Sequence, residues 1–289
     1  MSATPEMHSV DVNGFDAAAL AIVEHALTED IGTGDITTDG AVPEFARCTA
    51  ELVFEESGVV CGLALAAAVF ERLDPDFSVE IVVPDGERVG ATPAVIARLE
   101  GRARAVLTGE RVALNLLGRL SGIATATRRY VDEVAGTGTT ILDTRKTTPG
   151  LRLLERYAVA CGGGTNHRSG LYDAVLIKEN HIRIAGGVGS AIAAVRAAQP
   201  GMPVEVEVES EAELDEALAA GAERILLDNM TPERVEASVK RVDGRAWLEA
   251  SGGITFDTVR TFAETGVDAI SIGALTHSVR SLDVSLEVS

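Results

Sequence analysis

The stretch from Val204 to Leu227, VEVEVESEAELDEALAAGAERILL, decides the fold class. Its two ends, Val204–Val208 and Arg224–Leu227, are short and rich in Val, Ile and Leu, as buried strands are. Between them, Glu211–Ala220 is rich in Ala, Leu and Glu, which favour helix. A strand, a helix and a second strand in this order predict a parallel βαβ unit.

The same alternation continues over the second half of the chain. Further short apolar runs predict strands at Thr140–Leu142, Ala174–Ile177, Ala246–Glu249 and Ala269–Ile272. Helices are expected between strands, for example at Pro232–Arg241 and Asp257–Thr265. Ahead of the first strand we expect two helices, from Arg102 to Gly118 and from Ile123 to Val134. Six or seven such strand–helix units can close into a barrel.

The first hundred residues follow a different pattern. An apolar face at Leu20, Val23 and Leu27 predicts a helix over Asp16–Leu27, and the Ala-rich run Leu63–Leu73 predicts another. Strands are predicted at Cys48–Phe54, Phe77–Val83 and Ala94–Leu99. Helices and strands mixed in this way indicate an α+β module, so we expect two domains.

Composition narrows the class of function. With 289 residues, 46% of them hydrophobic, the chain can bury a sizeable core and is not disordered throughout. The net charge of −19, with no run of Lys or Arg, disfavours nucleic acid and anionic membranes as partners. The longest apolar run, Val59–Phe70, is too short to span a bilayer, and Met1–Asp11 lacks a signal-peptide pattern. We therefore expect a cytoplasmic protein.

Two rare residue types add information. The three cysteines, Cys48, Cys61 and Cys161, have no metal-ligand spacing, which indicates a reducing cytosol, and we interpret Cys161 as structural rather than nucleophilic. Only three of the 25 basic residues are lysines, and one of them, Lys240, is expected to be a solvated charge at a helix end. Many carboxylates with little lysine lead to the hypothesis that the protein works in concentrated salt.

Charged residues gather where the predicted strands end, and ligands of parallel α/β folds bind at the carboxyl ends of strands. The candidate cations there are Arg145, Lys146, Arg168 and Lys178, with Arg111 from the preceding helix added to the group. A cationic pocket within an acidic protein indicates an anionic substrate. Arginine suits bidentate binding of carboxylate or phosphate, and lysine supplies a point charge.

Acidic residues and glycines complete the candidate site. Glu207 and Asp228, on neighbouring predicted strands, can hold ribose hydroxyls, a Mg²⁺ ion or a developing positive charge. The loop Ser251-Gly252-Gly253 and the later Gly273 have the backbone freedom that phosphate-binding loops need. The sequence therefore indicates a phosphorylated substrate.

Two other classes of function stay open at this point. A Schiff-base aldolase would use Lys178 as its nucleophile, but that reaction leaves the other cations unexplained. A ligand-binding protein without catalysis would not need Glu207 and Asp228 facing a cationic pocket. A zinc site is not indicated, because His167 and His181 have no His or Cys partner at zinc spacing.

Beyond these residue-by-residue arguments, whole segments resemble the quinolinate phosphoribosyltransferase family. The similar segments are Ala26–Thr37, Gly109–Leu117, Asp143–Gly150, Gly162–Arg168, Leu176–His181, Val204–Val208, Leu227–Asn229 and Ala250–Ile254. They occur in the family's order and extend from about residue 20 to residue 280. The resemblance is specific, and no motif position departs from the family pattern.

The resemblance implies the fold and the reaction. The fold would be an N-terminal α/β sandwich, residues 1–114, followed by an open TIM-like α/β barrel of fewer than eight strands, residues 115–275. The tail 276–289 is expected to return to the sandwich. The reaction would be Mg²⁺-dependent transfer of phosphoribosyl from phosphoribosyl pyrophosphate to quinolinate. Its products would be nicotinate mononucleotide, pyrophosphate and CO₂, in de novo NAD biosynthesis.

The resemblance also implies roles for residues. The family is dimeric with shared active sites, so Arg111 would reach into the partner's site, and an assembly larger than a dimer stays open. The quinolinate pocket would be lined by Arg145, His167, Arg168 and Lys178. The catalytic group would be Lys146, Glu207 and Asp228, of which the two carboxylates would contact Mg²⁺ directly or through water. The 5′-phosphate would be held by Ser251, Gly252 and Gly273.

One alternative remains within the fold, a paralogue associated with molybdate transport that acts on another substrate. The full set of Arg111, Arg145, Arg168 and Lys178 favours the quinolinate enzyme, because each cation then has a carboxylate to bind.

Overall fold

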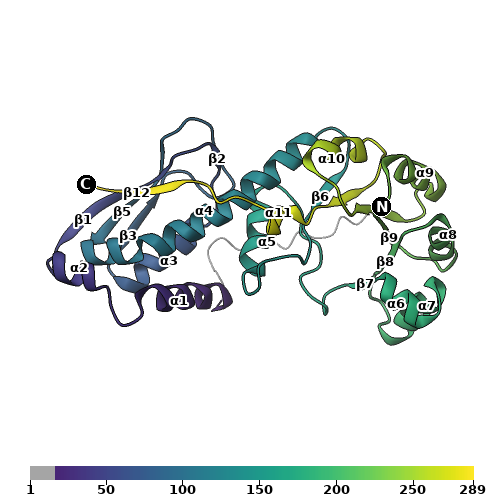
Figure 1. Ribbon diagram of the computed structural model, residues 1–289, viewed down its shortest axis with the longest axis horizontal. Coiled ribbons are helices and arrows are strands. Elements are labelled where there is room, and N and C mark those ends of the chain that lie inside the picture. The colour runs from purple at the N-terminus through teal and green to yellow at the C-terminus, as the bar shows by residue number, and fades with distance from the viewer. Residues whose placement is uncertain (1–16) are drawn as a thin grey trace. The chain divides into compact units, whose positions relative to one another are not determined.

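The structure is a computed structural model that describes residues 17–289 (Figure 1). Predictions that fall on Met1–Asp11 and on Asp16 lie outside the described residues. Contacts divide the chain into two compact units. The first contains the described part of Met1–Thr125, Pro149–Gly162 and Val279–Ser289, and the second contains Ala126–Thr148 and Gly163–Ser278.

The first unit is built around a four-stranded antiparallel sheet. Its strand order is β12-β1-β5-β3, with β1 at Arg47–Phe54, β3 at Ser78–Ile81, β5 at Ala94–Arg102 and β12 at Val284–Val288. The C-terminal strand β12 lies beside β1, where Ala50 pairs with Val288 on one side and with Leu99 on the other. A two-stranded pair joins β2, Gly58–Val59, to β4, Arg88–Val89.

In its described residues, the first unit also contains four helices and part of a fifth. They are α1 (Ala17–Ile31), α2 (Ile36–Ala41), α3 (Leu63–Leu73), α5 (Arg152–Cys161) and the first part of α4 (Ala103–Glu133). In α1 the predicted face keeps Val23 and Leu27 buried, whereas Leu20 is exposed. Phe70 of α3 stacks on Phe77 with ring centroids 5.0 Å apart, so helix and sheet share one apolar core.

The prediction of two helices between Arg102 and Val134 is wrong, because α4 is continuous. The glycines that suggested a break instead let the C-terminal segment approach the helix. A Cβ atom on Gly122 would lie 2.3 Å from the carbonyl oxygen of Arg280, and one on Gly118 would lie 2.8 Å from that of Leu282. The Leu282 N–H donates a hydrogen bond of 2.9 Å to the Gly118 carbonyl. Contact between backbones, not helix termination, explains these glycines.

The second unit contains an open six-stranded parallel sheet. Its order is β6-β11-β10-β9-β8-β7, with β6 and β7 at its edges. The strands are β6 (Thr140–Leu142), β7 (Val175–Ile177), β8 (Val204–Val208), β9 (Arg224–Asp228), β10 (Trp247–Ser251) and β11 (Ala269–Ser271). Each predicted strand is present within two residues of its expected bounds, and the fold class is confirmed.

Helices follow the strands of this sheet, as the βαβ pattern requires (Figure 1). They are α6 (Glu179–Ala185), α7 (Val188–Ala198), α8 (Glu211–Ala219), α9 (Pro232–Val242), α10 (Phe256–Ala263) and α11 (Ala274–His277). Ser210 caps α8 by accepting the Glu213 N–H, and Thr231 caps α9 with Pro232 directly after it. Within residues 17–289, no helix is long and apolar enough to cross a membrane.

Candidate active site

The parallel sheet has two chemically different faces, and the polar one carries the candidate site. In β8, Val204, Val206 and Val208 are fully buried on one face, so Glu205 and Glu207 project from the other. The register pairs Glu205 with Arg224, Glu207 with Leu226, and Asp228 with Ser251. Paired residues of parallel strands share a face, so charged side chains from neighbouring strands meet there. Arg224 lies 3.6 Å from the ring centroid of Trp247, as this shared face requires.

Lys178, Glu207 and Asp228 form one electrostatic group. Lys178, which follows β7, makes an ion pair with Glu207 on β8. Burial and the neighbouring Glu207 carboxylate raise the pKa of Asp228, while Lys178 and Lys146 oppose that rise. The Asn229 amide donates a hydrogen bond of 2.6 Å to Asp228 Oδ2. The three residues predicted for catalysis, Lys146, Glu207 and Asp228, therefore lie close enough to influence one another, together with Lys178, which was predicted to bind the substrate.

The segment that carries His167 is fixed to the end of β6. The Thr165 N–H donates to the Ile141 carbonyl at 2.8 Å, so the segment lies alongside the strand. The buried carboxylate of Asp143 accepts the backbone N–H of His167 at 2.7 Å. Gly163, with φ of +85°, lets the chain turn from α5 into this position. Asp143 thus orients the residues that follow the glycine run.

His167 lies between two buried carboxylates on the polar face of the sheet. Its Nε2 atom is 3.3 Å from Glu205 Oε2 and 3.4 Å from Glu249 Oε2. Burial lowers the pKa of His167, but the carboxylates of Glu205 and Glu249 outweigh it and raise the pKa to about 10. The cluster of His167, Glu205 and Glu249 therefore holds an extra proton at neutral pH.

The backbone determines which ring nitrogen of His167 faces the carboxylates. The Arg168 N–H donates a hydrogen bond of 2.7 Å to His167 Nδ1, so Nε2 is the nitrogen that lies against Glu205 and Glu249. Burial raises the pKa of Glu249, and the hydrogen bond from His167 opposes that rise.

Arg145 and Arg168 are close enough to repel each other. Burial and the positive charge of Arg145 lower the pKa of Arg168, and the carboxylates of Glu205, Asp173 and Glu207 oppose that effect. The Arg168 guanidinium also donates to the Ala174 carbonyl at 3.5 Å. Two guanidinium groups held together in a partly buried place favour binding of an anion, which would relieve their repulsion.

The late strands end in backbone suited to a phosphate. Gly252 and Gly253 have φ of +92° and +65°, and a Cβ atom on Gly252 would lie 2.2 Å from Asn229 Oδ1. The Ser251 hydroxyl accepts a hydrogen bond of 2.9 Å from the Ser271 hydroxyl. A Cβ atom on Gly273 would lie 3.1 Å from both Lys146 Cδ and His277 Nε2, so this glycine lies next to the Lys146 side chain. Bare backbone beside a lysine is the arrangement of a phosphate loop.

Comparisons with known proteins agree with this geometry. Residues 35–121 match the model of the quinolinate phosphoribosyl transferase N-terminal domain, and residues 123–287 match that of the C-terminal domain. The chain belongs to the quinolinate phosphoribosyl transferase family. The family prediction is confirmed.

Relatives and solved structures match over nearly the whole chain. A Mycobacterium leprae protein named nicotinate-nucleotide pyrophosphorylase [carboxylating] is 46% identical, over 95% of this chain and 98% of the relative. The chloroplastic protein of that name from Arabidopsis thaliana is 41% identical, over 93% of this chain and 82% of the relative. The structure of the nicotinate-nucleotide pyrophosphorylase from Francisella tularensis superposes with a TM-score of 0.91 at 42% identity, covering 94% of this chain and 96% of that one.

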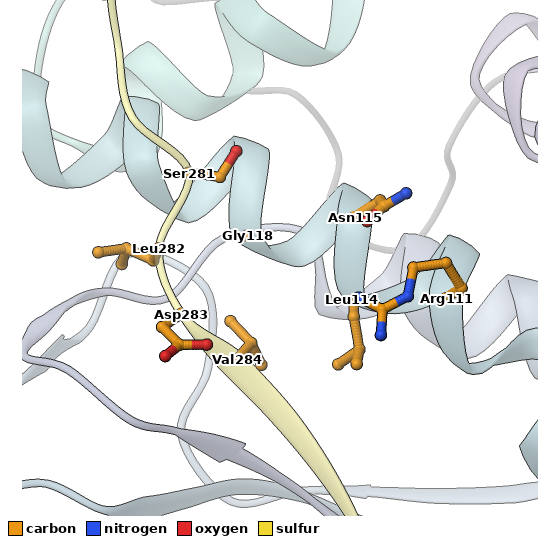
Figure 2. A pocket seen from close by; sticks show the side chains of 8 residues that line it. All are labelled: Arg111, Leu114, Asn115, Gly118, Ser281, Leu282, Asp283 and Val284. Atoms are coloured by element: carbon orange, nitrogen blue, oxygen red, sulfur yellow. The ribbon is translucent and has the colours of Figure 1, made fainter.

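Arg111 differs from the other residues predicted for this phosphoribosyltransferase site. It lies on α4 in the first unit, whereas the second unit assembles the rest. Its side chain is 64% exposed, and Glu110 lies 3.9 Å away. Figure 2 shows Arg111, Leu114 and Asn115 along α4, beside Ser281–Val284, the segment that leads into β12. These residues line a pocket of the first unit.

Three site residues of this family member were not predicted from the sequence: Asp143 in its orienting role, Glu205 and Glu249. Glu249 sits in a period-two pattern with buried Leu248 and Ala250, and this pattern places its carboxylate on the polar face. His181, by contrast, accepts the Lys178 backbone N–H at 2.9 Å through Nδ1, so it orders the start of α6.

Proposed function

We propose that the chain transfers phosphoribosyl from phosphoribosyl pyrophosphate to quinolinate with loss of CO₂. The products are nicotinate mononucleotide and pyrophosphate, in de novo NAD biosynthesis. The observation that carries the proposal is the pair Arg145 and Arg168, held together beside His167 in a member of this family. Quinolinate brings two adjacent carboxylates, which match two guanidinium groups.

Dicarboxylate binding accounts for the cations on the strand ends. Arg145 and Arg168 bind carboxylate oxygens, and Lys178 adds a point charge from the end of β7. The Lys178–Glu207 ion pair positions the ammonium group. A charged lysine is a poor nucleophile, so this pair disfavours the Schiff-base aldolase reading. Loss of CO₂ leaves an electron pair, and so negative charge, on the ring carbon. A nearby cation stabilises this charge until the carbon takes up a proton.

Ribosyl transfer places positive charge on the sugar, as glycoside chemistry does. Glu207 and Asp228 lie on neighbouring strands and are the carboxylates that stabilise this charge. Lys146 interacts with Asp228 and lies next to Gly273, so its ammonium serves the phosphate end of the substrate. Ser251, Gly252 and Gly273 hold the 5′-phosphate through the hydroxyl and bare backbone N–H groups.

The carboxylates also suit the divalent cation that the family uses. Glu207 raises the pKa of Asp228, which means that two hard oxygen donors face each other across neighbouring strands. Mg²⁺ held there, directly or through water, would supply positive charge for the leaving pyrophosphate. The repulsion between the carboxylates favours a bound cation.

A homodimer with shared active sites gives Arg111 a role. In the first unit this arginine has a 64% exposed side chain and one acidic neighbour, Glu110. An exposed arginine beside a pocket suits a substrate carboxylate presented by a partner subunit. The names of the M. leprae and A. thaliana relatives support the carboxylating enzyme and give no support to a molybdate-linked paralogue.

The test is an end-point assay with quinolinate, phosphoribosyl pyrophosphate and Mg²⁺. It follows nicotinate mononucleotide and CO₂ together, in dilute buffer and in concentrated KCl, because the net charge of −19 leads us to expect higher activity in salt. Equal yields of the two products are expected. A folded protein that forms neither product at either salt concentration would contradict the proposed reaction.

A further inference from the structure

Two of the three cysteines meet in the first unit, outside the residues of the proposed reaction. Cys61 directly precedes Gly62, the residue before α3, and Cys161 is the last residue of α5. Their sulfur atoms and a carboxylate oxygen of Asp85 all lie within 4.8 Å of one another. Cys61 is fully buried, whereas Cys161 is partly exposed, and both are free thiols. Cys161 is therefore the more accessible residue of the pair, and the two sulfur atoms lie close to each other.

Asp85 is already occupied by other donors, which argues against a metal ion here. Its carboxylate accepts the Gly62 N–H at 2.7 Å, the Leu63 N–H at 3.2 Å and the Tyr157 hydroxyl at 2.8 Å. These bonds hold the loop against the start of α3 and leave few lone pairs for a ligand role. The two thiols remain the reactive pair of the cluster.

The surroundings make the two thiols unequal. A hydrogen bond from the Cys61 thiol lowers the pKa of Cys161, against the effect of burial, and Tyr157 adds to the lowering. Burial raises the pKa of Cys61 well above its usual value. Cys48, on β1, is not a member of this cluster, and burial raises the pKa of its thiol. Attack at Cys161 and resolution by Cys61 is the order that this asymmetry favours.

We propose that Cys61 and Cys161 are a dithiol that a low-molecular-weight disulfide oxidises to an intramolecular disulfide. The Cys161 thiolate attacks one sulfur of the reagent, whose S–S bond breaks and releases a thiolate. The Cys61 thiol gives up its proton, which the released small thiolate takes up, and its sulfur attacks the Cys161 sulfur. The mixed disulfide breaks and releases the second small thiolate, which takes up the proton that Cys161 had lost. Two protein thiols are oxidised, and one small disulfide is reduced to two thiols.

The pair lies at a sensitive place in the chain. Cys161 is followed at once by Gly162, Gly163 and Gly164, and then by the segment that carries His167 and Arg168. A disulfide at Cys161 would fix the end of α5 from which that segment starts. Formation of the bond itself does not depend on the proposed enzymatic function.

The test treats the reduced, full-length protein with glutathione disulfide in the presence of a chelator. Remaining thiols are alkylated, and non-reducing peptide mapping by mass spectrometry locates each modification. A Cys61–Cys161 cross-link is expected, with Cys161 reacting at least about tenfold faster than Cys48. Cys48→Ser is the matched control and should form the same cross-link at the same rate.

The single variants separate the two roles. Cys61→Ser should stop the reaction at a mixed disulfide on Cys161, and Cys61→Ala repeats the test if the serine variant does not fold. Cys161→Ser should leave Cys61 unmodified, since that sulfur is fully buried. The proposal is overturned if the wild-type protein forms no Cys61–Cys161 link, if Cys48 reacts first, or if the untreated protein holds zinc that Cys161→Ser abolishes.

Discussion

The two larger sheets of this molecule carry similar charged side chains in very different surroundings. In the antiparallel sheet of the first unit, Arg98 pairs with Glu51 at 3.2 Å and with Glu80 at 3.4 Å, across adjacent strands. All three side chains are well exposed. In the parallel sheet of the second unit, Glu205 and Glu249 are buried around His167.

The difference lies in what holds the charges in place. Exposed cross-strand ion pairs are screened by water and contribute little to the free energy of unfolding. Charged side chains of this kind mainly keep the surface soluble. Burying a carboxylate costs folding free energy unless the group is paired. A cluster of buried carboxylates is therefore typical of a functional site. We therefore expect substitutions in the two sheets to differ sharply in effect.

Arg145→Ala should have the largest effect, because it removes one of the two guanidinium groups proposed to bind the dicarboxylate. Loss of a charge-assisted pair predicts a fall in kcat/KM of about 30- to 1000-fold, or about 2 to 4 kcal/mol. Arg241→Ala, which removes an exposed arginine paired with Glu211, is the matched control in the same unit. Near-normal kcat/KM for Arg145→Ala would refute its place in the pocket.

Mixing two inactive variants tests whether the two units of different subunits cooperate. Arg111→Ala and Lys178→Ala should each be inactive alone. After subunit exchange in an equal mixture, about a quarter of the sites should be intact, because half of the dimers are mixed and each has one wild-type site. Activity is measured on the mixture, and exchange is verified by mass spectrometry of differently tagged chains. Absence of recovery in verified mixed dimers would count against shared sites.

Glu249→Gln tests the buried cluster through the pH dependence of stability. The native pKa of His167, about 10, lies above the ordinary value of 6.5, so the native state binds more protons than the unfolded state between those values. The His167 contribution is fully present below pH 6.5 and is lost as the pH rises through about 10. Removing the Glu249 charge lowers the native pKa of His167. The pH range in which the native state binds more protons than the unfolded state should therefore become narrower.

The measurement for that variant is the urea unfolding free energy at a series of pH values from 6 to 10. Glu205→Gln should change the slope in the same direction, since both carboxylates face the same ring nitrogen. An identical pH slope in wild type and Glu249→Gln would show that the cluster does not hold the extra proton.

Arg98→Ala should have the smallest effect. Its ion pairs with Glu51 and Glu80 are exposed, so the midpoint of thermal unfolding should stay within about 2 °C of wild type. Differential scanning calorimetry checks this, with Glu80→Ala beside it. A much larger fall would mean that the exposed ladder holds the first sheet together, and the contrast between the sheets would fail.

Local patterns were enough to predict the parallel sheet. Runs such as Val204–Val208 are short, rich in β-branched residues and bounded by polar residues. Such runs can be recognised as strands from a few consecutive residues. The continuous α4 was missed because Gly118 and Gly122 serve a contact with residues 280–282, which are far away in the sequence. A glycine alone does not distinguish a helix end from a close approach.

The candidate site could be predicted where its residues stand at strand ends, as Lys178 and Asp228 do. Glu249 was harder, because a carboxylate inside a strand could equally belong to an exposed ladder such as Glu51 and Glu80. The sheet register, which pairs Glu249 with Leu226 and Ala269, decides that it is buried. The meeting of Cys61 and Cys161 likewise depends on a tertiary contact between the residues that precede α3 and the end of α5, which no local pattern encodes.

The most direct test of the dicarboxylate site is calorimetric binding of quinolinate and of nicotinate to the wild-type protein. Nicotinate lacks the second carboxylate, so Arg145 and Arg168 would have one anionic group fewer to bind. The account predicts binding of quinolinate at least about tenfold tighter than nicotinate, in low and high salt alike. Equal affinity for the two acids would contradict it.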